Sequence, residues 1–428
     1  MTITLILLLL LALIIVGVPV SFAILATGVV GLLSIGGPEL LNGVSQFAPA
    51  SSVMSYSLSA APLFIFMANL VLKSGLVDHL FTAARVIVGR AKGGTGVASV
   101  AAGAIFAAVS GSSTASAATL GQTSTVKMIN EGYAPKTASG LVAVVGTLAA
   151  MIPPSIILVF YAVTADVGVG DVLIAGIVPG LIIAVMLIGT MYLTGLSRSS
   201  AMPGGTQTTL REKFGAAINA LPVLALFAVV IGLVFFGIAT PTESAAVGCI
   251  AAFILLCVRR KATIENLIAA FVESIKTSAM ILAIIIGAEL FGHFLVETRL
   301  APRLVDWMSG LPFSPFVVMI IVALFYVILG FFLDQIAILA LTVPVVLPLV
   351  EQFGYDPVWF GIFIVLLAEV GLVTPPMGLN AFVVARSANR PVGEVFIGAV
   401  PYIIAMLIVA LVFLIWPEIV LWFPTYMK

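Results

Sequence analysis

The sequence contains the same pattern of prolines twice, and this internal repeat limits the possible folds more than any other feature. Five of the nine prolines in the first 206 residues recur 222 residues later in one ungapped register. The recurring pairs are Pro19 with Pro241, Pro135 with Pro357, Pro153 with Pro375, Pro154 with Pro376, and Pro179 with Pro401. Such agreement is improbable by chance. We therefore interpret the chain as a tandem duplication, with one copy in residues 1–205 and the second in residues 206–428.

The composition identifies an integral membrane protein. Hydrophobic residues make up 62% of the chain and charged residues 8%, against about 45–50% and 25% in soluble domains. The formal net charge is zero, which gives no support to nucleic-acid binding or to a polybasic membrane-surface role. Cys249 and Cys257 lack a redox or metal-binding spacing, and we interpret them as packing residues. Residues 1–5 carry no basic side chain, so we expect a retained first helix and not a removed signal peptide.

Long apolar stretches predict an all-α fold of about ten membrane-spanning helices, because one span needs about 20 mostly apolar residues. These stretches are residues 2–16, 19–36, 55–73, 134–164, 171–195, 215–236, 241–258, 276–296, 357–385 and 393–416. Two further apolar stretches, 94–127 and 313–351, contain small or polar residues near the middle, and we interpret them as re-entrant helical hairpins. Residues 75–91 and 298–310 are amphipathic, which is typical of helices that lie along the membrane interface.

Basic residues predict the orientation of the chain, because short loops rich in Lys and Arg stay in the cytoplasm. Placing the basic connections inside puts both chain ends outside and leaves only Arg299 and Arg303 on the wrong side. Each copy then contains five spans, an odd number, so the second copy is inverted relative to the first. Hairpin 94–127 enters from the cytoplasm and hairpin 313–351 from outside. Inverted repeats with interrupted helices are typical of transporters that bind their cargo near the bilayer midplane.

Two Pro-Pro pairs interrupt apolar helices at equivalent places, Pro153-Pro154 in residues 134–164 and Pro375-Pro376 in residues 357–385. Each pair removes two amide donors, and irregular backbone at membrane depth is stable only where it is buried or lines a cavity. The freed carbonyl oxygens suit a hard cation such as sodium, and a structural kink is the alternative. The residues that we predict to bind sodium are Ser112, Thr147, Met151, Ile152, Asp334, Gly371, Thr374 and Met377.

The hairpin tips add polar groups at the same depth. Residues 110–114 read Ser-Gly-Ser-Ser-Thr, and the matching residues 332–336 read Phe-Leu-Asp-Gln-Ile. Half-helix N-termini at such tips offer free amides to a carboxylate. An ionised Asp334 in mid-membrane costs about 2.5–3.5 kcal/mol, so we expect a cationic partner: sodium, a substrate group, or a Lys or Arg side chain. The candidate substrate-binding residues are Ser110, Ser112, Ser113, Thr114, Ser155, Asp334 and Asn380.

Four polar residues beside the breaks leave more than one interpretation open. Ser155 and Asn380 either bind a ligand or cap the second half of a broken helix. Thr147 and Glu369 occupy equivalent positions in the two copies, and the sequence assigns no role to Glu369.

Charged residues of the remaining spans are less informative. We expect Glu243, Glu289 and Lys276 to pair with one another or with a partner subunit. His79 and His293 belong either to a proton relay or to ordinary packing. The sequence contains no phosphate-binding loop, zinc motif or nucleophile with its base, so we do not expect an enzyme.

Several segments, spread over nearly the whole chain, resemble the large membrane subunit of tripartite ATP-independent periplasmic (TRAP) transporters, the DctM type. They are residues 111–114 (GSST), 132–135 (GYAP), 152–155 (IPPS), 170–171 (GD) with 175–176 (AG), 241–248 (PTESAAVG) and 374–380 (TPPMGLN). Two positions depart from the family pattern. Ser244 stands where Ala is usual, and Gln335 follows Asp334 at a variable position.

The resemblance implies a sodium-driven secondary transporter of the ion-transporter superfamily, located in the bacterial inner membrane as a multi-pass protein surrounded by lipid. The hairpins and broken helices would form a mobile domain that slides, like an elevator, against a static scaffold. The implied partners are a periplasmic substrate-binding protein that delivers an organic acid and a small DctQ-type membrane subunit, which we expect to be a separate chain. Family substrates include C4-dicarboxylates and sialic acids. Two equivalent breaks suggest two Na⁺ ions, and Na⁺ is the cofactor that we expect.

Other functions remain as alternatives. A stand-alone sodium–dicarboxylate symporter of the same fold would need no binding protein, so uptake by the chain alone distinguishes it. A channel or membrane scaffold is expected to have continuous helices and not two matched breaks.

Overall fold

The computed structural model describes residues 2–89, 92–196, 208–310 and 312–426, and every regular element in these ranges is a helix. Eight described helices are long and apolar enough to cross a membrane, or nine if one bent pair counts as a single span. The prediction of an all-α membrane protein is therefore confirmed. Two of the ten predicted spans, 2–16 and 357–385, contain helices shorter than these eight. They are α1 (Thr2–Ile15) and α18 (Pro357–Val373).

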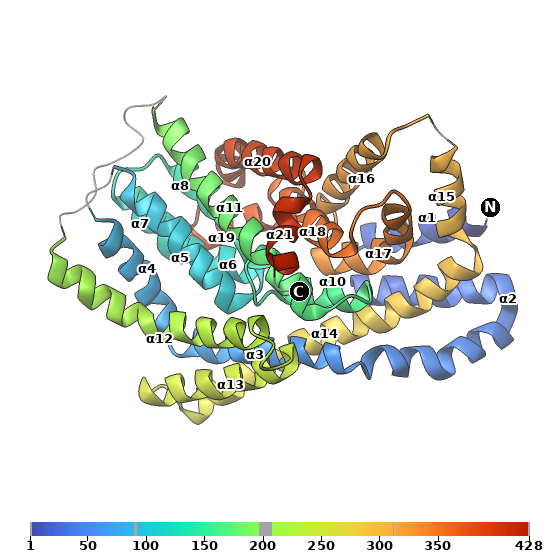
Figure 1. The fold of residues 1–428 in the computed structure, drawn as a ribbon, viewed down its shortest axis with the longest axis horizontal. Helices are drawn as coiled ribbons and strands as arrows, with labels where there is room; N and C mark the ends of the chain where they lie inside the picture. Colours follow the sequence, from blue (N-terminus) through green and yellow to red (C-terminus); the bar gives the residue numbers. More distant parts are fainter. Residues whose placement is uncertain (1, 90–91, 197–207, 311, 427–428) are drawn as a thin grey trace.

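Two long helices, α2 (Val20–Val53) and α14 (Ile264–Glu297), pack along each other and brace one side of the molecule. Small residues allow this approach, since a Cβ atom added to Gly28 would lie 2.7 Å from the Phe291 nitrogen. We call α2 and α14 the scaffold, together with α1, α3 (Ala60–Lys73), α12 (Leu210–Phe235) and α13 (Pro241–Val258). In Figure 1 most of the scaffold lies along the bottom, with α12 and α13 to the left and α14 to the right.

Both predicted hairpins are present as pairs of helices. Hairpin one consists of α5 (Gly94–Ser110) and α6 (Ser113–Leu120), and α6 continues through a π-helical turn, η2 (Gly121–Thr125), into α7 (Val126–Asn130). Hairpin two consists of α16 (Pro315–Gly330) and α17 (Gln335–Gln352). Figure 1 shows hairpin one in the left half of the molecule and hairpin two in the right half.

An amphipathic helix precedes each hairpin, as predicted. These helices are α4 (Leu76–Val88) and α15 (Leu300–Ser309). An ion pair between Arg85 and Glu131 attaches α4 to the end of hairpin one.

Both predicted helix breaks are also present. In the first copy α8 (Pro135–Val145) and α9 (Leu148–Met151) end before Pro153, and α10 (Ile156–Thr164) continues at an angle of 45°. In the second copy α18 ends at Val373, and α19 (Leu379–Ser387) begins after Gly378. Every residue of α18 from 359 to 373 is buried, so this broken helix lies in the centre of the molecule.

We call the hairpins and broken helices the core body, together with α11 (Val169–Leu196), α20 (Val392–Ile415) and α21 (Glu418–Tyr426). The junction between the two copies, at residues 197–207, lies outside the described ranges.

The structure differs from the predicted elements at two boundaries and in one additional helix. Residues 37–54, which connect the predicted spans 19–36 and 55–73, are mostly helical, because α2 resumes at Pro38 after a change of direction at Gly37 (φ 66°). Helix α14 begins at Ile264 and not near 276, since the Thr263 hydroxyl caps it by accepting from the Asn266 amide at 3.2 Å. Helix α21, which begins just after Pro417, was not among the predicted spans.

Candidate functional site

The two hairpin tips meet at one carboxylate, that of Glu369 on α18. The Ser113 hydroxyl of hairpin one and the Gln335 side-chain amide of hairpin two both donate hydrogen bonds to Glu369 Oε1. Ser113 and Gln335 are equivalent positions of the two copies, 222 residues apart. Glu369 is fully buried, and its second oxygen, Oε2, has no hydrogen-bond partner among the described residues. The sequence predicted that the two copies meet but not through which atoms. In the structure they meet at Glu369 Oε1, which accepts a hydrogen bond from each copy.

Glu369 has no predicted role in the sequence. The proline register placed it opposite Thr147, but that register does not show which side chains two packed copies bring together. A signal was nevertheless available, because Glu369 is an acidic residue in an otherwise apolar run and its neighbours in sequence offer no basic partner. An intramembrane carboxylate of this kind marks a functional site by default.

Asp334 stands at the tip of hairpin two, where its side chain caps α17. Its Oδ1 accepts from the Ala337 amide at 2.9 Å, and the side chain is exposed. No Lys or Arg side chain of the described ranges forms an ion pair with Asp334. Of the partners considered for this residue, the structural pair with a basic residue is therefore not found.

The serines of hairpin one divide into two groups. Ser110 is buried, and its hydroxyl lies 2.7 Å from that of Ser116, within the hairpin. Ser112 caps α6 by accepting from the Ala115 amide at 3.4 Å. Ser112 and Thr114 are half-buried, so they line the accessible side of the tip, while Ser113 points toward Glu369.

The tip of hairpin one lies directly on the first helix break. A Cβ atom added to Gly111 would be 3.0 Å from the Pro154 carbonyl oxygen, and the φ of Gly111 is +56°. Glycine is the residue that fits such a turn without strain. The structure therefore brings the predicted hairpin tip and the predicted break together.

At the first break, side chains form hydrogen bonds with some of the main-chain groups that the prolines leave without helical partners. The Ser155 hydroxyl donates to the Ala150 carbonyl at 2.8 Å and accepts from the Leu158 amide at 3.3 Å, so Ser155 caps α10. The Thr147 hydroxyl donates to the Val144 carbonyl at 2.6 Å. Met151 is buried and Ile152 half-buried, and the Met151 carbonyl faces Gly176 of α11.

The second break differs, because one of its polar side chains is left unpaired. The Thr374 hydroxyl donates to the Val370 carbonyl at 2.5 Å, and the Thr374 amide donates to the Gly371 carbonyl at 3.0 Å. Met377 is exposed. Asn380 is fully buried, and neither atom of its amide group has a hydrogen-bond partner in the described part of the chain. The capping interpretation therefore applies to Ser155 and not to Asn380.

The oxygen atoms at the breaks are of the type that a hard monovalent cation binds. The hydroxyls of Thr147 and Thr374 donate their protons to carbonyl groups of their own helices. The lone pairs of both hydroxyl oxygens remain available as acceptors. Two buried side chains retain unpaired oxygens: Glu369, within α18 five residues before Thr374, and Asn380, two residues after Gly378. A buried polar atom without a partner is unusual in a native protein and is often explained by an ion or a water.

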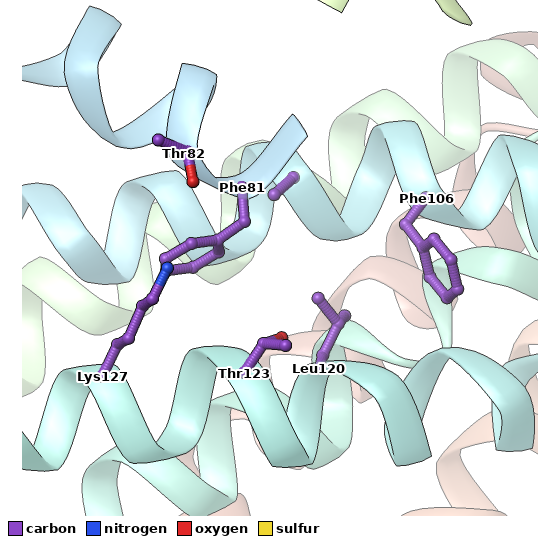
Figure 2. A pocket seen from close by; sticks show the side chains of 7 residues that line it. Phe81, Thr82, Phe106, Leu120, Thr123 and Lys127 are labelled. Atoms are coloured by element: carbon purple, nitrogen blue, oxygen red, sulfur yellow. The ribbon is translucent and has the colours of Figure 1, made fainter. Parts of the chain in front are cut away.

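An apolar cavity of about 310 Å³ lies between hairpin one, the first break and α12, where Ile152 and Pro153 line it. Two further cavities near the core body have polar side chains in their lining. The larger, about 430 Å³, separates scaffold helices α2 and α14 from α10 and α17 and is lined by polar residues that include Asp166, Glu289 and His293. The smaller, about 140 Å³, lies between α4 and hairpin one; Figure 2 shows the Lys127 side chain beside the Phe81 ring, 4.6 Å from its centroid. The smaller cavity includes none of the tip residues.

Pairing of Glu243, Glu289 and Lys276 with one another is not found in the described part of the chain, and their pairing with a partner subunit stays a prediction. Glu243 pairs with neither Glu289 nor Lys276, because it forms a capping box with Thr240 at the start of α13. Glu289 instead lies 3.5 Å from His293 on the same helix. The side chain of His79 lies outside the described part of the structure.

An all-helical membrane protein with two re-entrant hairpins that meet at two broken helices belongs to the class of secondary transporters built from inverted repeats. The family model described as "Tripartite ATP-independent periplasmic transporter, DctM component" matches residues 7–419. The chain therefore belongs to this family of transport permeases, and it is not an enzyme.

Two of the named relatives are matched over most of their length, and a third only over about two thirds. The chain is 33% identical over 373 residues to the C4-dicarboxylate TRAP transporter large permease protein DctM of Pseudomonas aeruginosa, covering 87% of each chain. It is 29% identical to the sialic acid TRAP transporter large permease protein SiaM of Vibrio cholerae, covering 95% of each. It also matches 64% of the isethionate TRAP transporter permease protein DctMQ of Oleidesulfovibrio alaskensis at 30% identity.

The fold also has a solved counterpart. The YdaH transporter of Alcanivorax borkumensis, described as having an unusual topology, superposes with a TM-score of 0.68 over 93% of this chain and 96% of that chain. Sequence identity is 13%, so this likeness supports the fold and not the cargo.

Proposed function

We propose that this chain is the transport subunit of a sodium-driven TRAP importer for an organic acid of the C4-dicarboxylate or sialic acid class. The observation that carries the proposal is the convergence of equivalent tip residues, Ser113 and Gln335, on buried Glu369. Convergence of the two copies at membrane depth is the geometry in which inverted-repeat transporters hold cargo. The relatives named for C4-dicarboxylates and sialic acid support the substrate class.

Sodium would be held at the two breaks by oxygen atoms of this chain. Main-chain carbonyls of Met151, Ile152 and Gly371, with the hydroxyls of Thr147 and Thr374, supply the oxygen type that sodium prefers. The remaining predicted ligands are Ser112, Asp334 and Met377. Each sodium that descends a 100 mV inside-negative potential contributes about 2.3 kcal/mol. Two such ions entering with one monovalent anion therefore favour accumulation of the anion.

The substrate carboxylate would bind at the accessible side of the tips. Ser112 and Thr114 are half-buried there, and Asn380 retains an unpaired amide. The backbone amides at the starts of α6 and α17 favour an anion. Ser110, Ser113, Ser155 and Asp334 belong to the same group of candidates, although Ser113 and Ser155 already have partners within the protein.

The scaffold and the core body would move past each other as an elevator. The cavity of about 430 Å³ lies at their boundary, between α14 on one side and α10 and α17 on the other. A loosely filled boundary of this kind is easier to shear than a packed interior. The expected setting is the bacterial inner membrane, with a small DctQ-type subunit and a periplasmic substrate-binding protein as partners.

Uptake by proteoliposomes tests the proposal. The chain is reconstituted with its small subunit, and candidate binding proteins are added, each loaded with a different radiolabelled acid. We expect uptake with one acid class, only with the binding protein present and only with an inward sodium gradient. Uptake that ignores sodium and follows a pH gradient would exclude the sodium mechanism.

The second candidate is a stand-alone sodium–dicarboxylate symporter. The likeness to the YdaH transporter, at 13% identity, supports the fold and is equally compatible with both candidates. Uptake of free dicarboxylate by the chain without any binding protein would favour the second candidate.

A further inference from the structure

We propose that Glu369 is a positioning residue that couples the two hairpin tips, so that a change at one tip is transmitted to the other through its carboxylate. Coupling of this kind serves transport only if the proposed function holds, because both tips would then enclose one cargo. The hydrogen bonds themselves do not depend on that function.

A single oxygen atom carries the coupling. Glu369 Oε1 accepts from Ser113 at the start of α6 and from Gln335 at the start of α17, so neither tip can withdraw without changing the acceptor that the other tip uses. Glu369 stands on α18, whose residues 359–373 are all buried, so water does not replace a lost donor. In a dry site, an unpaired carboxylate or amide is strongly unfavourable.

The first copy has no matching bridge at its equivalent position. Thr147 donates to the Val144 carbonyl of its own helix, 2.6 Å away, and not to a hairpin. The two breaks are therefore unlike in this respect, and the link between the hairpins is made at Glu369. Because Ser113 and Gln335 come from opposite halves of the chain, this link joins the two copies at their tips.

Cysteine labelling measures the coupling without transport. Cys249 and Cys257 are first replaced by Ala, and Phe332→Cys is introduced at the exposed position three residues before Gln335. The rate of its reaction with a water-soluble maleimide in the purified full chain reports opening of hairpin two. Ser113→Ala, which alters only hairpin one, is then added to proteins that carry Glu, Gln or Leu at position 369.

With Glu369 present, we expect Ser113→Ala to speed labelling at position 332 several-fold. With Glu369→Leu the rate should already be high and should no longer respond to Ser113→Ala. Glu369→Gln should behave like Glu369, because its amide oxygen still accepts both hydrogen bonds. No response in the Glu369 protein, or an equal response in Glu369→Leu, would overturn the proposal.

A matched control separates coupling from general loosening. Tyr326→Phe removes a buried hydrogen bond of 2.7 Å to Thr342, within hairpin two and away from its tip. The response to Ser113→Ala should persist in this variant, and its loss would count against Glu369 as the link. Labelling needs neither sodium nor substrate, so failure here leaves the proposed function standing, and failure of uptake leaves the coupling standing.

Discussion

Gly371 of α18 lies so close to Gly330 of α16 that a Cβ atom added to Gly371 would be 2.4 Å from the Gly330 Cα atom. Gly330 is the last residue of α16, just before the tip that carries Asp334. Gly371 lies four residues before Pro375. Two glycines thus hold hairpin two against the broken helix, and the contact fixes the position of one tip.

Gly371→Ala should destabilise this contact. Backbone and not a flexible side chain opposes the new methyl group, so we expect a loss of about 1–3 kcal/mol in the free energy of unfolding, as in other overpacked interiors. Thermal unfolding in detergent measures the loss. Gly393→Ala is the control, since a Cβ atom there meets nothing within 4 Å. Equal unfolding temperatures for the two variants would show that α16 can move away freely.

Asp334 combines a helix cap with a charge, and two substitutions separate them. Asp334→Asn keeps a good N-cap, while Asp334→Ala loses about 1 kcal/mol of stability. We expect both variants to fold and both to lose uptake, because neither retains the negative charge. Uptake and unfolding temperature are measured on the same preparations. Full uptake by Asp334→Asn would show that the charge at this tip is not needed.

Asn380→Leu replaces a buried, unpaired amide with an apolar group of similar size. Since no hydrogen bond within the described chain is lost, we expect stability to be unchanged or higher by about 1 kcal/mol. Uptake should fall sharply if the amide serves a ligand. A variant that transports normally would contradict this role, and a strongly destabilised variant would mean that the amide is bonded within the fold.

Gly292→Trp tests the cavity between the scaffold and the core body. Gly292 lines this cavity, and a Cβ atom there meets nothing within 4 Å. The indole should fill the space without unfolding the protein and reduce uptake by about tenfold or more, because it would obstruct the boundary along which the scaffold and the core body are proposed to slide. Gly43→Trp, at an exposed position of α2 with nothing within 4 Å, is the control. Equal uptake by both variants would remove the cavity from the transport path.

Much of the fold was predictable because its signals are local. Pro-Pro pairs end helices wherever they occur, and polar tips such as residues 110–114 interrupt apolar runs, so both breaks and both hairpins were predicted correctly. The helical residues after Gly37 were missed because Gly37 and Pro38 are typical of a loop. Here they only redirect α2, and packing against α14 stabilises the rest of the helix.

The site was less predictable because it depends on contacts between distant segments. Ser155 was correctly given capping as one of two interpretations, since the Leu158 amide lies three residues away. The bridge from Ser113 to Glu369 spans 256 residues, and no local pattern encodes it. The charge of Asp334 drew attention in the sequence, while Glu369, hidden in an apolar run, is the carboxylate that the packed copies enclose.

Opposite orientation of the two copies is the central claim, and sidedness labelling tests it most directly. Asn130 and Gln352 are equivalent, exposed positions at the ends of hairpins one and two. Each is replaced by Cys in a protein without Cys249 and Cys257, and labelled with a membrane-impermeant maleimide in right-side-out and inside-out vesicles. We predict that position 130 reacts only from the cytoplasmic side and position 352 only from the periplasmic side. Reaction of both positions from the same side would contradict the account.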